Sequence, residues 1–170
     1  ALPILREHAR ANLRLFRIQK DIPWNREGAR NLGADQARFD WLVHIDIDHI
    51  LPPASARALI DYEAKPGYFY RFPRWRCGRA DETRRKDRIP QEQEFGRIHP
   101  HVDSYLMTRA WYWKVGGYDE DFSGCLGGGS DFLRRAEALL GAAGLPEDIC
   151  LHGYTRSRIP DASVWSLRRA

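Results

Sequence analysis

The chain has no apolar run close to the roughly 20 residues that a helix needs to cross a bilayer. Its first residues also lack the basic stretch followed by an apolar stretch that marks a secretory signal. Cysteines are few, because only Cys77, Cys125 and Cys150 are present, and no two of them form a Cys-x-x-Cys pair. This usage supports neither a disulfide framework nor a thiolate zinc site. We therefore expect a soluble chain in a reducing, cytoplasmic compartment.

No internal repeat is found, and the composition has neither a disordered nor a fibrous bias. The 170 residues, of which 43% are hydrophobic and 29% charged, fit one domain over residues 1–170 with a core of its own. The net charge of +4 favours an anionic ligand without identifying it. A sugar nucleotide and a nucleic acid both remain open as partners.

Hydrophobic periodicity predicts helices and strands that alternate along the chain, and hence an α/β fold. Helices are predicted over 2–10, over 25–39 with Asn25 as its N-cap, over 55–64, over 110–115 with an end at Gly116 and Gly117, and over 132–144. Strands are predicted over 12–18, 41–47, 67–73 with its end at Pro73, 103–109 and 148–154. The nearly continuous apolar stretch 41–47 predicts a central parallel strand that is covered on both faces. The charged and aperiodic stretch 76–94 predicts a long mobile loop.

Two carboxylates, Asp46 and Asp48, stand two residues apart at the end of the predicted buried strand. Alternate strand residues share a face, and open α/β sheets bind ligands beyond the carboxyl ends of their strands. Hard divalent cations take oxygen ligands, and one or two carboxylates with substrate phosphates often hold them. Acids are also common in turns after strands, so a purely structural role explains this motif equally well by itself.

Two longer blocks carry a family resemblance. The first runs from Trp24 to Pro53 and holds Ala-Arg-Asn-Leu-Gly at 29–33, a hydrophobic strand and Asp46-Ile47-Asp48. It resembles the core signature of family 2 glycosyltransferases. The second, VGGYDEDFSGCLGGGSDFLRR at 115–135, is similar to the family's later glycine and acid block, with a galactosyltransferase-like character at its C-terminal side. Two blocks in the right order are far more specific than either alone.

The resemblance implies a GT-A type fold, a three-layer α/β/α arrangement with a mixed, mostly parallel sheet. It implies a hexosyltransferase-like enzyme that moves a sugar from a nucleoside-diphosphate sugar to an acceptor hydroxyl with Mn²⁺ or Mg²⁺, by an inverting route. The expected acceptor is a glycan, a lipid or a protein, among which the resemblance does not choose. Family members place two strands before the segment that begins at Asn25, so we expect that the N-terminal strand is missing here and that the natural protein extends upstream.

The second block suggests the catalytic base. Relatives carry Glu-Asp or Asp-Asp where this chain has Ser130-Asp131, and Asp131 resembles the general base of the inverting members. Such a base must reach the acceptor hydroxyl within hydrogen-bond distance. The structural alternative is that Ser130 caps a helix and that Asp131 is stabilised by the helix dipole.

Further ligands follow from the resemblance. Asp46, Asp48 and a late histidine, His152, are the expected metal ligands, with His49 as a weaker candidate, although isolated histidines are more often ordinary hydrogen-bonding residues.

The expected donor contacts come from Asn25, Arg30 and Asn31, of which Arg30 suits phosphate best because a guanidinium binds it bidentately. Trp111 and Trp113 are candidate platforms for a sugar ring, and both could equally be core residues.

Two alternative functions remain open. The arginine-rich stretch 71–88, with Trp75 inside it, could serve a nucleic-acid-binding module, although its acids dilute the charge and no RNA-module signature is present. A loop over the acceptor cleft is the competing interpretation of this stretch. The substitution at Ser130 would also fit a degenerate protein that binds a sugar nucleotide without turnover.

Overall fold

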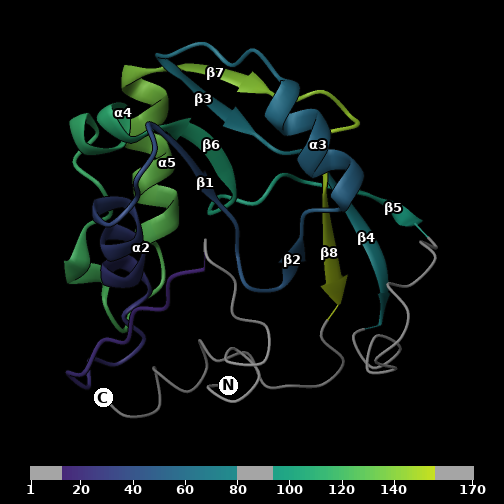
Figure 1. The fold of residues 1–170 in the computed structure, drawn as a ribbon. Helices are drawn as coiled ribbons and strands as arrows, with labels where there is room; N and C mark the ends of the chain where they lie inside the picture. The colour runs from purple at the N-terminus through teal and green to yellow at the C-terminus, as the bar shows by residue number, and fades with distance from the viewer. Residues whose placement is uncertain (1–12, 80–93, 156–170) are drawn as a thin grey trace.

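The computed structural model describes residues 13–79 and 94–155 (Figure 1). Helices and strands mix along this part of the chain, so the α/β class is confirmed. The predicted helix over 2–10 lies outside the described residues. The elements are α2 (Arg26–Asp35), β1 (Trp41–His44), β2 (His49–Ile50), α3 (Pro53–Asp61), β3 (Tyr68–Arg71), β4 (Arg74–Arg79), β5 (Glu94–Ile98), β6 (Tyr105–Thr108), α4 (Arg109–Lys114), the 3₁₀ turn η2 (Glu120–Phe122), α5 (Gly128–Leu139), β7 (Gly141–Gly144) and β8 (Leu151–Thr155).

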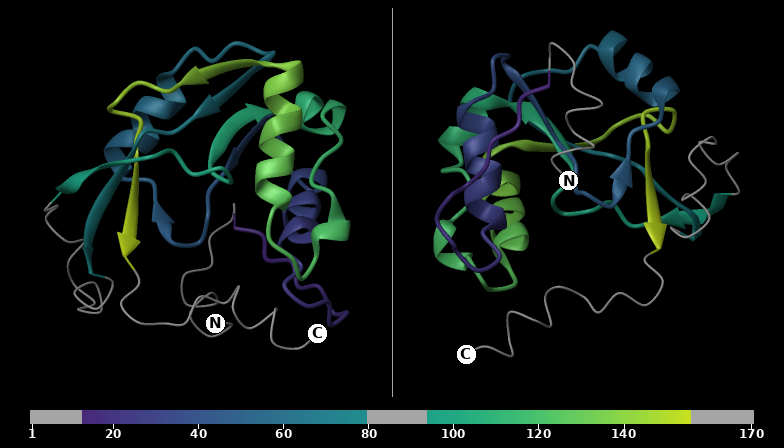
Figure 2. Two further views of the ribbon diagram at one scale, coloured as in Figure 1. Left: turned by 180° about the vertical axis from the view of Figure 1, so that it is seen from behind. Right: turned by 60° about the horizontal axis from the view of Figure 1, so that its bottom comes forward.

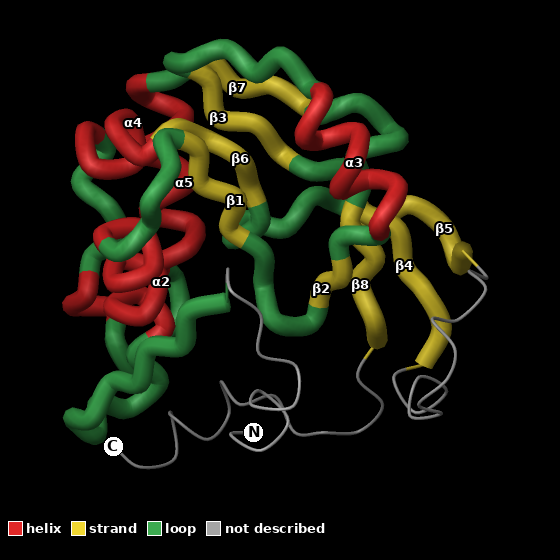
Figure 3. Tube along the Cα trace, in the orientation of Figure 1, coloured by secondary structure: helices red, strands yellow, loops and turns green. Residues whose placement is uncertain are grey.

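The strands form two four-stranded sheets, in the orders β1-β6-β3-β7 and β2-β8-β4-β5 (Figure 3). Only the pairs β3–β7 and β4–β8 are parallel. The other four pairs in the described residues are antiparallel, so the prediction of a mostly parallel sheet is wrong for this part of the chain. The reason is that β6 lies between β1 and β3 and runs against both, while β4 and β5 form an antiparallel pair.

The predicted central strand is shorter and lies elsewhere in the sheet. β1 ends at His44 and pairs antiparallel with β6, from Trp41 opposite Thr108 to His44 opposite Tyr105. Among the described strands it is an edge strand, which corrects the prediction of a central parallel one. The ladder stops because the Asp46 backbone N–H donates to the Ser104 hydroxyl, at 3.2 Å, and no longer to a strand.

Helices α2, α4 and α5 gather against one face of the first sheet, and α3 lies apart from them (Figures 1 and 2). Alternate residues of β6 face the two sides: Tyr105 and Met107 belong to the core under α2, α4 and α5, whereas Leu106 belongs to the core beside α3. Phe132 of α5 stacks on Tyr118 with ring centroids 4.5 Å apart. This aromatic core fixes α5 against the sheet, and with it the loop before α5.

The strand predicted from Gly67 as far as Pro73 contains β3, which ends at Arg71. A second strand, β4, begins directly after Pro73 and belongs to the second sheet. The predicted loop 76–94 is therefore partly strand, since β4 extends to Arg79 and β5 begins at Glu94. Its charged residues do not prevent strand formation, because β8 and β5 pair with β4 on its two sides. The rest of that loop, residues 80–93, lies outside the described residues.

Two further predictions are wrong in the described part of the chain. Residues 13–18 form no strand, and the apolar side chains of Leu13, Leu15, Phe16 and Ile18 are exposed. The last predicted helix ends at Leu139, after which residues 141–144 form β7. Alanine and glycine at these positions resemble a helix in sequence, but pairing with β3 makes them a strand.

Several local predictions are confirmed. Asn25 caps α2 by accepting a hydrogen bond from the Gly28 N–H at 3.0 Å. α4 begins at a Thr108 cap and ends before Gly116 and Gly117, whose φ angles of 99° and 63° lie in the left-handed region that favours glycine. Among the described residues, no helix combines the length and the apolar character required to cross a membrane.

Candidate functional site

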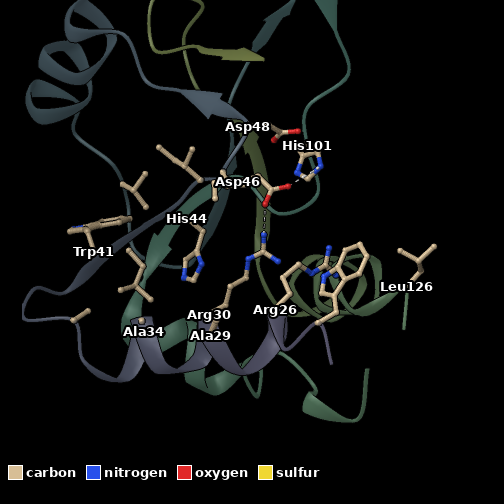
Figure 4. Close-up of a pocket in the computed structure, with 17 residues that line it drawn as sticks. Arg26, Ala29, Arg30, Ala34, Trp41, His44, Asp46, Asp48, His101 and Leu126 are labelled. Atoms are coloured by element: carbon tan, nitrogen blue, oxygen red, sulfur yellow. Dashed lines mark hydrogen bonds and ion pairs between the residues drawn. The ribbon is translucent and has the colours of Figure 1, made fainter. Parts of the chain in front are cut away.

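A pocket of about 1080 Å³ lies between α2, β1 and the loop that follows β1 (Figure 4). Small residues of α2 and of the turn after it form one wall and leave room beside the helix: Ala29, Gly33, Ala34 and Ala37. Aromatic rings stand at Trp24, Trp41 and His44. The far end is polar and charged, and is formed by Arg26, Arg30, Asp46, Asp48 and His101. The pocket thus joins an apolar slot to an ionic end.

At the ionic end, Asp46 is held from two sides. Its Oδ1 is 3.1 Å from Arg30 Nη2, and its Oδ2 is 3.5 Å from His101 Nε2 (Figure 4). The ring of His49 lies 5.1 Å from that of His101, centroid to centroid. One ligand atom from each of Asp46, His49 and His101 lies within 4.8 Å of the other two. Three ligand atoms at these separations are compatible with one shared metal ion.

Asp48 stands beside this group and not within it. Its Oδ1 faces His49 Nδ1 at 3.2 Å, and neither atom makes a hydrogen bond in the described structure. His152 is buried on β8, where it is in register with Ile50 and Trp75, and its Nε2 is 3.8 Å from the Cys150 sulfur. The structure therefore brings two histidines to Asp46, and His152 is not one of them.

His101 has no local sequence signal, and sequence reasoning missed it. It follows β5 at a distance in the sequence that no motif spacing would connect with Asp46. Its Nδ1 accepts a hydrogen bond from the Asp103 backbone N–H at 3.3 Å, so the turn 101–104 presents Nε2 toward Asp46. Only the fold brings this residue into the site.

His49 is electrically neutral in this setting. Burial, as the main cause, lowers its pKa to about 4, Asp48 acts in the opposite sense, and His101 and Arg74 lower it further. The Arg74 Nη1 lies 2.8 Å from its Nε2. A neutral imidazole is the protonation state that binds metal ions.

Two buried acids lie behind the pocket, and sequence reasoning missed both. Asp103 is 1% exposed and contacts Arg26 Nη1 at 3.0 Å, Arg30 Nη1 at 3.3 Å and the Tyr118 hydroxyl at 2.9 Å. Glu27 is fully buried and pairs with Arg26 Nη2 at 2.7 Å. Arg30 therefore bridges the buried Asp103 and the pocket-facing Asp46.

These acids occupy space that Gly128 and Gly129 leave free. A Cβ at Gly128 would lie 2.5 Å from Glu27 Oε1, and one at Gly129 would lie 2.8 Å from Asp103 Cγ. The first turn of α5 thus rests directly on two carboxylates, at the helix end where negative charge is stabilised. The run of glycines before a helix was the available signal for such a close approach.

Asp131, the expected base, lies in the first turns of α5. Its Oδ2 accepts from Arg135 Nε at 2.7 Å and its Oδ1 from Arg134 Nη2 at 3.0 Å. The hydrogen bond from Arg135 is the main cause that lowers its pKa, and Arg134 lowers it further. The helix cap is Gly127, with a φ of 114°, and not Ser130, which the structural alternative named as the cap. Asp131 is not among the residues that line the pocket, and its role as base stays a prediction.

Of the three expected donor contacts, only Arg30 lines the pocket. Asn25 is engaged as the α2 cap and also accepts from the Ser123 hydroxyl at 3.2 Å. Asn31 ties α2 to the segment after α4: its amide donates to the Tyr118 carbonyl and to Glu120, and its Oδ1 accepts from the Tyr112 hydroxyl and the Tyr118 N–H. Both asparagines have structural contacts that account for them.

The two expected sugar platforms lie on α4, outside the lining of the pocket. The Trp111 ring packs against the aromatic core and carries the Lys114 ammonium 3.9 Å from its centroid. Trp113 is 42% exposed. Their role toward a sugar stays a prediction.

Comparison with known protein families decides the assignment. The family model described as Glycosyl transferase family 2 matches residues 2–126. The chain belongs to glycosyl transferase family 2. A search of curated proteins found no match. Membership confirms the resemblance drawn from residues 24–53 and implies a GT-A glycosyltransferase that uses a nucleotide-sugar donor and an acceptor. The family 2 match ends at Leu126, so the galactosyltransferase-like character of the later block stays a prediction.

Proposed function

We propose that this family 2 domain transfers a sugar from a nucleoside-diphosphate sugar to an acceptor hydroxyl with the help of a divalent cation held by Asp46, His49 and His101. The observation that carries the proposal is the convergence of these three side chains at the ionic end of the pocket between α2 and β1. The apolar slot would take the nucleoside, and the ionic end its diphosphate.

The donor set fits a cation on three grounds. Asp46 and the two imidazoles supply one carboxylate oxygen and two nitrogens within reach of one ion. His49 is neutral at pH 7. The buried Asp48 Oδ1 and His49 Nδ1 also make no hydrogen bond among the described residues, so a ligand to either atom would replace none. Two imidazoles favour Mn²⁺ or a similar transition metal over Mg²⁺, which prefers oxygen ligands.

The protein's own residues have distinct parts in this proposal. Arg30, held by Asp103, can present its guanidinium to a phosphate in a fixed orientation. A bound cation would neutralise the charge that develops on the departing diphosphate. The inverting route and Asp131 as its base belong to the proposal through the family resemblance. For that role, the acceptor hydroxyl must displace Arg134 or Arg135 from the carboxylate.

The GT-A layering belongs to the proposal as well. The two core clusters on opposite faces of the first sheet support a three-layer α/β/α arrangement, because α2, α4 and α5 cover one face and α3 lies by the other. A strand that precedes the described residues would complete it.

The test is metal-dependent nucleotide binding, with Mn²⁺ followed by electron paramagnetic resonance and UDP or GDP followed by calorimetry. Asp46→Asn and His101→Asn should each weaken Mn²⁺ binding about ten-fold or more, the loss typical of a removed ligand or its close partner. Asp35→Asn, an exposed acid on α2, is the matched control. Unchanged Mn²⁺ affinity in both site variants would contradict the assignment.

The same measurement separates two ligand sets. If Asp46, Asp48 and His152 hold the ion, His152→Asn and Asp48→Asn should weaken binding while His101→Asn does not. With Asp46, His49 and His101 as ligands, His152→Asn should have little effect on affinity, and Asp48→Asn a moderate one through the orientation of His49.

A second candidate function is binding of a sugar nucleotide without turnover. The observation that favours it is that both oxygens of Asp131 are engaged by arginines, which opposes proton uptake. Donor hydrolysis in the presence of Mn²⁺ distinguishes the two functions, since only an active transferase should release the nucleoside diphosphate.

A further inference from the structure

A second hollow, of about 680 Å³, lies on the pair of strands β4 and β5. We call it the basic groove, and its lining residues are Arg74, Arg76, Arg97, Ile98, His99 and Pro100. The described residues of its lining include three arginines and no carboxylate. Its volume falls within the range of small-molecule sites, roughly 300 to 1,000 Å³. The groove thus has the size of a sugar site and a charge of one sign.

Two of these arginines, Arg74 and Arg76, form no ion pair with any described residue. Arg97 is paired with Glu147, at 2.6 Å. Arg74 contacts only neutral acceptors, the His99 carbonyl at 2.9 Å and His49 at 2.8 Å, and Arg76 makes no ion pair with any described residue. Burial lowers the pKa of Arg74, Asp48 and Asp46 act in the opposite sense, and the neighbouring Arg76 lowers it further. Two guanidiniums therefore face the groove and repel each other.

One side chain connects the basic groove with the group of proposed metal ligands, Asp46, His49 and His101. Arg74 lines the groove and its Nη1 touches His49 of that group. β4 also lies next to β8, which pairs with β2, the strand on which His49 stands (Figure 3). A molecule in the groove would therefore sit beside the ionic end of the donor pocket, on the side away from the slot between α2 and β1.

We propose that the basic groove binds the acceptor, and that the acceptor is a saccharide carrying an oxyanion, either a carboxylate or a phosphate ester. The inference rests on the proposed sugar transfer, because it takes the neighbouring pocket as the donor site. Planar guanidiniums bind both kinds of oxyanion bidentately. An oxyanion between Arg74 and Arg76 would relieve their repulsion and hold the rest of the sugar toward His49 and Asp46.

The experiment follows the Nε–Hε signals of arginine by nuclear magnetic resonance on the full chain. The probes are glucuronate, glucose 6-phosphate and methyl glucoside at about 0.15 M salt, which screens exposed charges over about 8 Å. The two anionic sugars should shift the signals of Arg74 and Arg76, and methyl glucoside should not. Inorganic phosphate, as a fourth probe, should bind more weakly than glucose 6-phosphate if the groove also contacts the sugar.

Variants make the test specific. Arg76→Gln should weaken binding of the anionic sugars about ten-fold or more, the loss expected for one charge-assisted hydrogen-bonded pair. Arg76→Lys keeps the charge and loses the planar guanidinium. Its affinity for the anionic sugars should lie between those of the unaltered chain and Arg76→Gln. Arg57→Gln removes an exposed arginine from α3 and is the matched control. Arg76 is exposed, so these variants should fold normally, and thermal unfolding checks this.

Three outcomes would overturn the proposal: equal binding of anionic and neutral sugars, an equal loss in Arg76→Gln and Arg57→Gln, or shifts at Arg74 and Arg76 with a single-stranded oligonucleotide and none with the anionic sugars. Mn²⁺-dependent UDP or GDP binding by the unaltered chain is measured alongside. Its absence would refute the proposed function, whereas its presence without a preference for anionic sugars would refute only the acceptor assignment.

Discussion

Gly129 should tolerate no side chain, because a buried carboxylate occupies the space beside it. A Cβ there would lie 2.8 Å from Asp103 Cγ and 2.9 Å from Asp103 Oδ2. Asp103 has no room to withdraw, since it is 1% exposed and bound by Arg26, Arg30 and Tyr118. Gly129→Ala must therefore displace α5 or break part of this ion-pair group.

The size of the effect follows from opposing contributions. Overpacking costs about 1 to 3 kcal/mol, and partial loss of a buried ion pair adds to that. Better helix propensity returns about 1 kcal/mol. We expect Gly129→Ala to lower the free energy of unfolding by about 2 kcal/mol, which corresponds to roughly 4 to 8 °C in the melting temperature of a domain of this size.

The assay is urea unfolding followed by circular dichroism, with one control and one double variant. Gly33→Ala, also on a helix but with nothing within 4 Å of the added Cβ, should raise stability by about 0.5 to 1 kcal/mol. In an Asp103→Ala background the obstructing carboxylate is gone, so Gly129→Ala should become neutral or stabilising. An equal cost of Gly129→Ala in both backgrounds would refute the steric reasoning.

Two more variants test the structural roles assigned above. Asn31→Ala removes the acceptor of the Tyr112 hydroxyl and the Tyr118 N–H, so we expect a loss of about 2 to 4 kcal/mol in unfolding free energy, and a loss below 1 kcal/mol would contradict the role. For Asp131→Asn we expect the free energy of unfolding to fall by about 0.5 to 1 kcal/mol at pH 7, because the ion pair with Arg135 is lost. Because the pKa of Asp131 is lowered in the folded chain, its stabilisation is present above the unfolded pKa of about 4 and is lost as the pH falls through the folded value. The two proteins should then differ less at about pH 3 than at pH 7, and a constant difference would argue against the ion pair.

Local patterns predicted much of the fold. Caps and helical periodicity located α2, α3 and α4, and the strand over 103–109 contains β6. Those features depend on neighbours in the sequence. β7 could not be predicted, since Gly-Ala-Ala-Gly has no strand preference of its own and pairs with β3 only after the chain has folded. The edge position of β1 was missed because it also depends on strand pairing, here with β6, that exists only in the folded chain.

The residues of the candidate site also fall into two groups, those that sequence motifs revealed and those that only the fold brings together. Asp46 and Arg30 were found because each belongs to a motif, and both line the pocket. His101 and Asp103 could not be found, because neither lies near a motif in sequence and a turn between β5 and β6 carries them to α2. Their placement depends on long-range packing that periodicity does not encode.

Arg30 has a consequence beyond its place in the pocket. One guanidinium group is shared between Asp46, which faces the ligand, and Asp103, on which α5 rests. A cation that binds Asp46 would weaken the ion pair between Asp46 and Arg30. The Arg30 guanidinium would then pair more strongly with Asp103. Occupancy of the pocket is thereby coupled to the packing of α5, although no residue of α5 lines the pocket. Protection of the α5 amides from hydrogen exchange should therefore increase when a cation alone occupies the ionic end, which makes that helix an indirect sensor of cation binding.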